Sequence, residues 1–206
     1  MKHTVLYIHG KGGSAGEAAH YRALFPDAAV IGLDYKAETP WEAAAEFPAL
    51  FDRLCGGADA VTLIANSIGA YFAMHALAEK AVRRAFLISP IVDMESLILG
   101  MMRAAGVSED ALREAGEIAT AFGETLSWEY LRYVREHPLA WNTPTEILYG
   151  ERDALTSFDA VAAFAGRIGA GLTVCPAGEH WFHTAEQMAF LDRWILEKAA
   201  ALSPQA

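Results

Sequence analysis

Residues 60–71 read Ala-Val-Thr-Leu-Ile-Ala-Asn-Ser-Ile-Gly-Ala-Tyr, an apolar run that leads into small residues around one hydroxyl side chain, Ser67. The run 61–65 predicts a buried strand, and the residues after it predict a helix. A serine at such a sharp strand-to-helix turn needs small neighbours two positions away, because the two chain segments must pass closely. Here these neighbours are Ala65 and Gly69, so we interpret Ser67 as a candidate nucleophile.

The pentapeptide departs from the pattern Gly-x-Ser-x-Gly at its first position, where Ala65 is the smallest substitute for glycine. A serine between small residues also occurs by chance, and its ordinary role is then to cap the helix that follows. The rest of the chain decides between these interpretations.

Six short apolar runs alternate with longer amphipathic stretches, a pattern that predicts strands alternating with helices. The predicted strands are 4–8, 29–33, 61–65, 85–89, 146–149 and 172–175. Because these runs are continuously apolar, the strands should be buried on both faces, as in a parallel sheet. We therefore predict an α/β fold, a three-layer α/β/α sandwich with a mostly parallel sheet of about six strands.

Between residues 91 and 142 the alternation stops, and about fifty residues of helix-favouring sequence precede the next strand. The segment is rich in methionine, leucine and aromatic residues, with glycines between them. We predict that 91–142 is a helical cap insertion within a single domain spanning 1–206. The alternative is that its apolar side chains only dock its helices on the core.

The composition excludes several classes of protein. With 206 residues, of which 53% are hydrophobic, the chain can bury a core without disulfides or a metal. The formal net charge of -10 argues against a nucleic-acid partner. The two cysteines, Cys55 and Cys175, lie far apart and in no metal-ligand spacing. We expect no metal site, and a reduced, cytoplasmic compartment.

Targeting and membrane signals are also weak. Only Met1–Thr4 precede an apolar run that is too short for the apolar region of a signal peptide. The most apolar later stretch, 91–102, is interrupted by Asp93 and Glu95, and it falls short of the roughly 20 residues that cross a bilayer. We expect neither secretion nor a membrane span. A helical insertion and open edge strands are compatible with a homodimer, although the sequence does not determine the oligomeric state.

Two of the predicted strands lead into segments suited to binding a negative charge. Residues 9–14 read His-Gly-Lys-Gly-Gly-Ser, whose glycines leave the backbone free to direct N–H groups at an anion. This segment lacks the spacing of a phosphate-binding loop. The N–H of Ile68, at the start of the helix after Ser67, is the second candidate donor of an oxyanion hole. The first is the N–H of Lys11, with Gly12 as its alternative.

The last two predicted strands lead into candidate acid and base residues, at the sheet edge where ligands bind. Asp153 follows strand 146–149 and is the candidate acid; its alternative role is to cap the next helix, although Thr156 and Ser157 lie nearer to that helix. Residues 178–183, Gly-Glu-His-Trp-Phe-His, follow the last strand and hold two histidines. One of them is the candidate base.

With Ser67, Asp153 and His180 in this order and at these strand ends, the chain resembles the α/β-hydrolase superfamily over nearly its whole length. The resemblance is carried by His9–Gly10 with the glycines after it, by 65–69, by 148–153 and by 178–182. It implies the α/β-hydrolase fold, with a trimmed sheet that lacks the family's first two strands. The family's Gly-x-His-x-Phe-like context favours His180 over His183. Asp153 is preferred to Asp93, which occupies the place of the acid in some relatives.

The resemblance implies a serine hydrolase with a catalytic triad and an oxyanion hole. Ser67 would attack an acyl carbon, His180 would take its proton, Asp153 would orient the imidazole, and water would free the acyl group. No metal or organic cofactor is required. The apolar insertion favours a small to medium, partly apolar acyl substrate.

A carboxylesterase is the first hypothesis. The same triad also serves thioesterases, lactonases, amidases and carbon–carbon bond hydrolases. The alternative from another class is a catalytically inactive protein of this fold that binds a small apolar ligand or a protein partner.

Overall fold

The structure, a computed structural model, describes residues 2–201. Contacts between residues divide the chain into two units. One runs up to Ile91 and resumes at Ala140, and the other is Val92–Leu139. None of the helices in the described part combines the length and the apolar run that a bilayer crossing needs.

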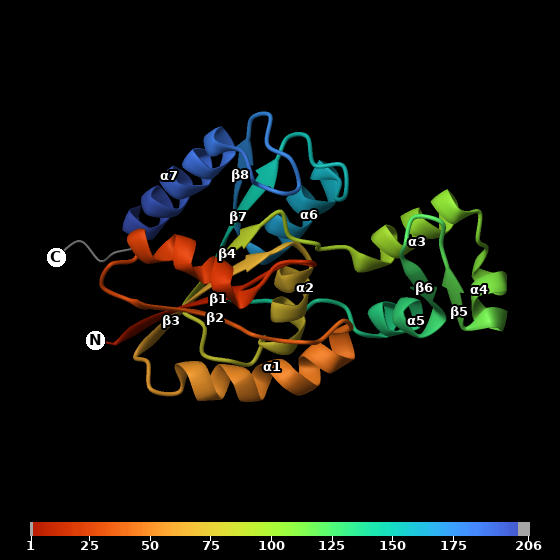
Figure 1. The fold of residues 1–206 in the computed structure, drawn as a ribbon, viewed down its shortest axis with the longest axis horizontal. Coiled ribbons are helices and arrows are strands. Elements are labelled where there is room, and N and C mark those ends of the chain that lie inside the picture. The colour runs from red at the N-terminus through yellow and green to blue at the C-terminus, as the bar shows by residue number, and fades with distance from the viewer. Residues whose placement is uncertain (1, 202–206) are drawn as a thin grey trace. The chain divides into compact units, whose positions relative to one another are not determined.

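A six-stranded sheet forms the centre of the first unit (Figure 1). The strand order is β2-β1-β3-β4-β7-β8, and all neighbouring strands are parallel. The strands are β1 (His3–Ile8), β2 (Ala29–Gly32), β3 (Ala60–Asn66), β4 (Arg84–Ile88), β7 (Thr145–Gly150) and β8 (Gly171–Cys175). Each of them begins and ends within one residue of a predicted strand. The predicted sandwich with a parallel sheet of six strands is confirmed.

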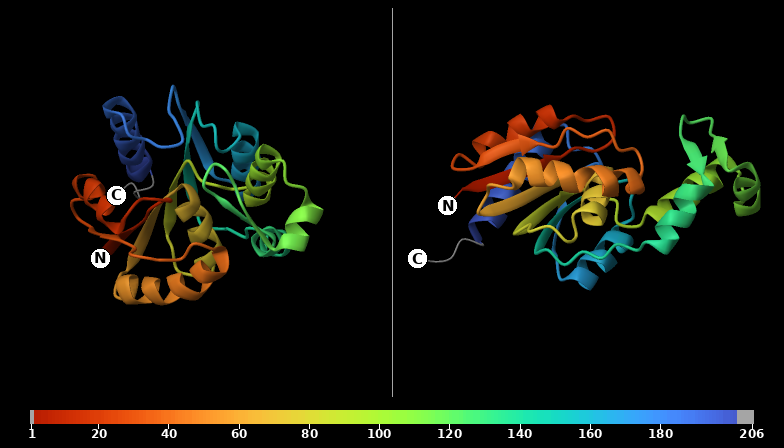
Figure 2. Two further views of the ribbon diagram at one scale, coloured as in Figure 1. Left: turned by 45° about the vertical axis from the view of Figure 1, so that its right-hand side comes forward. Right: turned by 90° about the horizontal axis from the view of Figure 1, so that it is seen from below.

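Helices cover both faces of this sheet, as right-handed connections between parallel strands require. They are the 3-10 helix η1 (Ala15–Ala23) and the α-helices α1 (Pro40–Cys55), α2 (Ser67–Ala76), α6 (Phe158–Ile168) and α7 (Ala185–Ala201). One face carries η1 and α7, where the rings of Phe86 and Trp194 meet edge to face at 5.6 Å in the core. The other face carries α1, α2 and α6 (Figure 2). The loops at the carboxyl ends of the strands are thereby held on a rigid base.

The second unit contains helices and a small antiparallel sheet, and all of its residues are described. Its elements are α3 (Met94–Ala105), α4 (Glu109–Ala115), β5 (Glu117–Ala119), β6 (Thr125–Ser127) and α5 (Trp128–Glu136). Helix-favouring sequence was expected throughout, and that expectation is wrong for the β5–β6 hairpin. Gly116, with a φ of 76°, follows the end of α4, and Gly123, with a φ of 88°, lies in the turn between the strands. Left-handed residues such as these do not continue a helix.

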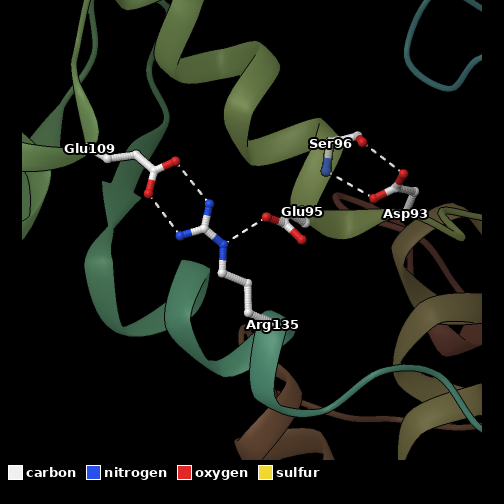
Figure 3. Close-up of polar contacts among 5 residues, drawn as sticks. All are labelled: Asp93, Glu95, Ser96, Glu109 and Arg135. Atoms are coloured by element: carbon white, nitrogen blue, oxygen red, sulfur yellow. Dashed lines mark hydrogen bonds and ion pairs between the residues drawn. The ribbon is translucent and has the colours of Figure 1, made fainter.

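Ionic contacts link α3, α4 and α5 within the second unit (Figure 3). The guanidinium of Arg135, on α5, donates two parallel hydrogen bonds to the Glu109 carboxylate, at 2.8 and 2.9 Å, and a third to Glu95 at 2.7 Å. The Asp93 carboxylate caps α3, because it accepts the N–H and the hydroxyl of Ser96 at 2.9 and 2.7 Å. The role of this unit as a cap stays a prediction.

Candidate active site

Ser67 is the first residue of α2 and directly follows β3 in the middle of the sheet. Its backbone is left-handed, with a φ of 49°, a conformation that is uncommon outside glycine. The carbonyl of Ser67 accepts the N–H of Ile91 at 3.2 Å, which ties the turn to the segment after β4. The turn therefore presents the Ser67 side chain at the carboxyl edge of the sheet.

The small residues around Ser67 have a steric explanation. A Cβ at Gly69 would lie 2.1 Å from the carbonyl oxygen of His9, and a Cβ at Gly10 would lie 3.2 Å from the Cβ of Ser67. The loop after β1 thus packs directly on the strand-to-helix turn. Ala65, where the motif departs from glycine, is fully buried in β3.

His180 connects Ser67 to Asp153. Its Nε2 lies 2.7 Å from the Oγ of Ser67, and its Nδ1 lies 2.7 Å from an Oδ of Asp153. Because a charged carboxylate can only accept, the hydrogen bond to Asp153 assigns the ring proton to Nδ1 and leaves Nε2 as an acceptor for the serine hydroxyl. The three side chains come from the carboxyl ends of β3, β7 and β8, so the parallel sheet brings them together.

The Asp153 carboxylate is fully buried. Besides the bond from His180, it accepts the N–H groups of Leu155 and Thr156, at 2.8 and 3.0 Å, and the hydroxyl of Thr156 at 2.9 Å. Burial alone would raise the pKa of Asp153, but the hydrogen bonds from His180, Thr156 and Leu155 outweigh it and lower the pKa below its ordinary value. Asp153 is therefore charged at neutral pH.

The alternative acid, base and capping residues have other partners. Ser157, whose Oγ accepts a helix N–H at 3.2 Å, is the cap of α6. The Asp93 carboxylate is bonded to Ser96. The Nδ1 of His183 lies 2.8 Å from the Trp181 carbonyl oxygen, and its ring stacks on the indole of Trp181 with centroids 4.6 Å apart.

Two loops carry the candidate acid and the candidate base, and they are called here the acid loop, 151–157, and the base loop, 176–184. Their backbones touch, because a Cβ at Gly150 would lie 2.6 Å from the carbonyl oxygen of Gly178. The N–H of Arg152 donates to the same carbonyl at 2.7 Å. This contact fixes the separation of the two loops. The sequence offered a signal for it, a glycine at the end of β7, but sequence reasoning missed its role.

The loop after β1 forms a turn closed by a hydrogen bond from the Gly13 N–H to the Gly10 carbonyl at 3.1 Å. Gly12 has a φ of 75°, which suits the third position of a type II turn. Lys11 precedes it at the exposed tip. Ile68 lies in the first turn of α2, where backbone N–H groups have no acceptor within the helix. The N–H groups of Lys11 and Ile68 as oxyanion donors stay a prediction.

Tyr35 supports this loop and was missed by sequence reasoning, since no motif marks it. Its hydroxyl donates to the His9 carbonyl at 2.8 Å, and its ring stacks on the His9 imidazole with centroids 4.3 Å apart. Burial, with smaller contributions from nearby carboxylates, raises the pKa of Tyr35 to about 12. The hydroxyl therefore remains a donor at neutral pH.

The two cysteines are buried and free. Burial raises the pKa of both thiols, that of Cys55 to about 11, so thiolate chemistry is disfavoured. Within residues 2–201, no cluster of three or more histidine, cysteine or acidic residues is arranged to hold a metal ion.

Solved structures of other proteins are similar over nearly the whole chain. Est1E from Butyrivibrio proteoclasticus has a TM-score of 0.75 at 15% identity, over 97% of this chain and 87% of that one. The structure of Est1E with ferulic acid bound has a TM-score of 0.73 at 17% identity, over 96% of this chain and 88% of that one. Alpha/beta hydrolase domain-containing protein 10 from mouse has a TM-score of 0.77 at 16% identity, over 97% of this chain and 90% of that one.

The thioesterase domain of the curacin biosynthetic pathway is less similar, with a TM-score of 0.58 at 16% identity, over 95% of this chain and 91% of that one. A scan against models of protein families finds no match, and neither does a sequence comparison with curated proteins. At these identities the likeness concerns the fold. The chain has the α/β-hydrolase fold.

Proposed function

We propose that this protein is a serine hydrolase that cleaves a small to medium, partly apolar ester through an acyl-enzyme intermediate. The observation that carries the proposal is the continuous hydrogen-bond chain from Asp153 through His180 to the Oγ of Ser67, with both contacts at 2.7 Å. A nucleophile, a base within hydrogen-bond reach of it and a buried group that orients the base are the parts that acyl transfer needs.

The proposed reaction has two halves. The Oγ of Ser67 attacks the acyl carbon while its proton passes to Nε2 of His180, and the charged Asp153 stabilises the imidazolium. The proton then passes from His180 to the oxygen of the leaving alcohol as the bond to that oxygen breaks. In the second half a water molecule gives a proton to His180 and attacks the acyl carbon. The bond from that carbon to the Oγ of Ser67 then breaks, and His180 returns the proton to Oγ.

The negative charge that develops on the acyl oxygen would be bound by backbone N–H groups of Lys11, or of Gly12, and of Ile68. Two observations support this role. Gly10 packs on Ser67 and so brings the turn at 10–13 beside the nucleophile. The N-terminal turn of α2, which holds Ile68, has N–H groups and a helix dipole that favour negative charge.

Large apolar side chains on both loops support a substrate with an apolar portion. Trp181, next to His180, is 72% exposed, and Leu155, two residues after Asp153, is 46% exposed. Exposed apolar groups of this size beside a polar site favour an apolar ligand. Because ferulic acid is bound to Est1E in one of the similar structures, esters of aromatic acids are the first substrates to test. A thioester and a lactone belong in the same panel.

The test is intact-mass spectrometry after incubation with a fluorophosphonate probe. We expect a single adduct on the wild type and none on Ser67→Ala. His180→Ala should lose the adduct, whereas His183→Ala, a matched change in the same loop, should keep it. A folded wild type that stays unlabelled and hydrolyses none of the esters would overturn the proposal in favour of a non-catalytic binding protein.

A further inference from the structure

A second chain of hydrogen bonds, which the proposed mechanism does not use, runs beside the site from the buried Tyr7 to the exposed Glu17. The hydroxyl of Tyr7 donates to Oε2 of Glu17 at 2.5 Å and accepts from Nδ2 of Asn66 at 3.0 Å. Tyr7 is 1% exposed. A tyrosine hydroxyl has only one proton, so donation to Glu17 leaves it as an acceptor toward Asn66. The three groups therefore form one chain with a fixed direction.

The Glu17 end of this chain holds the loop that is proposed to supply an oxyanion donor. The second carboxylate oxygen of Glu17 accepts the N–H of Ser14 at 2.9 Å. A Cβ at Gly13 would lie 2.7 Å from that same oxygen. The end of the turn at 10–13 is thus folded around the carboxylate.

The Asn66 end holds the other side of the site. Asn66 is the last residue of β3 and directly precedes the nucleophile Ser67. Its amide oxygen is buried and has no hydrogen-bond partner among the described residues. The amide nitrogen of the same side chain donates the hydrogen bond to Tyr7, which ties Asn66 to the chain.

We propose that Tyr7 and Glu17 are positioning residues, which hold the turn at 10–13 and the strand-to-helix turn at 66–68 at a fixed separation so that their N–H groups converge on one oxyanion. The inference rests on the proposed function. An oxyanion hole requires donors at about 2.7–3.1 Å from the developing charge. A shift of about 1 Å in such a site can cost about 100-fold in rate.

The properties of Tyr7 suit this role. Burial, followed by contributions from Tyr21 and Glu17, raises the pKa of Tyr7 far above its ordinary value, so the hydroxyl keeps its proton throughout the working pH range. Glu17 also caps η1 through Ser14, and that role alone would explain a bond to the Ser14 N–H. It would not explain the bond to Tyr7, which is what Tyr7→Phe removes while the cap stays in place.

The experiment compares Tyr7→Phe with Tyr21→Phe, a matched change in the same core. The ring of Tyr21 packs on that of Tyr7 with centroids 5.1 Å apart, and Tyr21 is 3% exposed. We measure kcat and KM on an ester that the wild type hydrolyses, the second-order rate of fluorophosphonate labelling, and the affinity for phenylboronic acid, which places an oxygen in the oxyanion hole of a serine hydrolase.

For Tyr7→Phe we expect kcat, labelling rate and boronic-acid affinity each to fall about 10-fold or more, with KM within about 2-fold of the wild type. Tyr21→Phe should leave all of them within about 2-fold. Asn66→Ala, which breaks the chain at its other end, should lower kcat similarly. The double variant Tyr7→Phe/Asn66→Ala should be no slower than the slower of the two single variants, because both changes break the same chain of hydrogen bonds.

If Tyr7→Phe does not fold, Asn66→Ala decides alone. A folded Tyr7→Phe or Asn66→Ala with wild-type kcat and labelling rate would overturn the inference, as would equal losses in Tyr21→Phe. Such results would leave the proposed function standing, because the wild type would still be labelled at Ser67. A wild type that is not labelled at all would overturn both.

Discussion

The carbonyl oxygen of His9 lies so close to the Cα of Gly69 that a Cβ there would stand 2.1 Å from it. Both partners belong to backbone, which cannot swing aside as the end of a side chain can. Gly69→Ala should therefore separate the loop after β1 from the turn at Ser67. We expect a loss of about 1–3 kcal/mol in the free energy of unfolding, measured by urea denaturation, and a slower labelling of Ser67.

A matched substitution in α6 provides the control for Gly69→Ala. Gly166 is an exposed helical glycine, and a Cβ there would meet nothing within 4 Å. Gly166→Ala should stabilise the protein by about 0.5–1 kcal/mol, because alanine is the better helix former. Equal effects of the two changes would contradict the steric explanation of Gly69.

The choice between two acids can be tested by the same isosteric change at each. Asp153→Asn should lower kcat by roughly 10⁴-fold, because an amide at this position no longer holds the imidazole in the required tautomer. Asp93→Asn should leave kcat unchanged and stability within about 0.5 kcal/mol, since asparagine caps a helix as well as aspartate does. Ester hydrolysis by both variants is the measurement. If only Asp93→Asn lost activity, Asp93 and not Asp153 would be the acid of the proposed triad.

The lowered pKa of Asp153 predicts a pH dependence of stability. The folded state binds a proton at Asp153 less readily than the unfolded chain, whose aspartates titrate near about pH 3.9. The contribution of Asp153 is therefore present above that pH and is lost as the pH falls through the lower folded-state pKa. Urea denaturation from about pH 6 to about pH 3 should show that the stability difference between wild type and Asp153→Asn shrinks on acidification. If the stability difference between wild type and Asp153→Asn stayed constant over this pH range, the predicted link between stability and protonation of Asp153 would be refuted.

Trp181 should determine which esters are preferred. Trp181→Ala should lower kcat/KM for the ethyl ester of an aromatic acid by about 10-fold, equivalent to about 1.4 kcal/mol of lost apolar contact, and should leave ethyl acetate within about 2-fold. Leu196→Ala is the control, because Leu196 is also an exposed apolar residue, at 47%, but lies on α7. Alcohol release or acid production in a pH-stat gives both rates. An equal loss for both esters would argue against contact with the acyl group.

The sheet could be predicted from the sequence because its four inner strands, β1, β3, β4 and β7, are almost wholly buried. The expectation of burial on both faces is wrong for the edge strands β2 and β8, most of whose residues are partly exposed. Val61 to Ala65 is apolar except for Thr62, and all five residues are buried in the structure. Such a strand can be recognised from its local sequence, because a nearly continuous run of apolar residues is the pattern expected of a strand that is buried on both faces. The β5–β6 hairpin could not be predicted in this way, because it has only three residues in each strand and Gly116 and Gly123 decide its course.

The candidate site was less accessible to sequence reasoning. The chain offers two histidines three positions apart in the base loop, and family resemblance rather than periodicity favoured His180. The structure links His180 to a serine 113 positions away. That link depends on the close packing of the base loop against the backbone at Gly150, where the acid loop begins. The bond between Tyr7 and Glu17 follows no spacing rule either, since it joins a buried residue of β1 to an exposed residue of the 3-10 helix η1.

If Ser67 is the nucleophile, as proposed, its left-handed backbone sets stability against activity. An L-amino acid in this conformation raises the free energy of the folded chain by about 1 kcal/mol or more, an expense that glycine avoids. Ser67→Gly should therefore yield a protein that resists urea better than the wild type while losing the hydroxyl that is proposed to attack the ester. Selection for thermal stability alone would remove the serine. Under the proposed function, its presence at this turn is a compromise in which some stability is given up for catalysis.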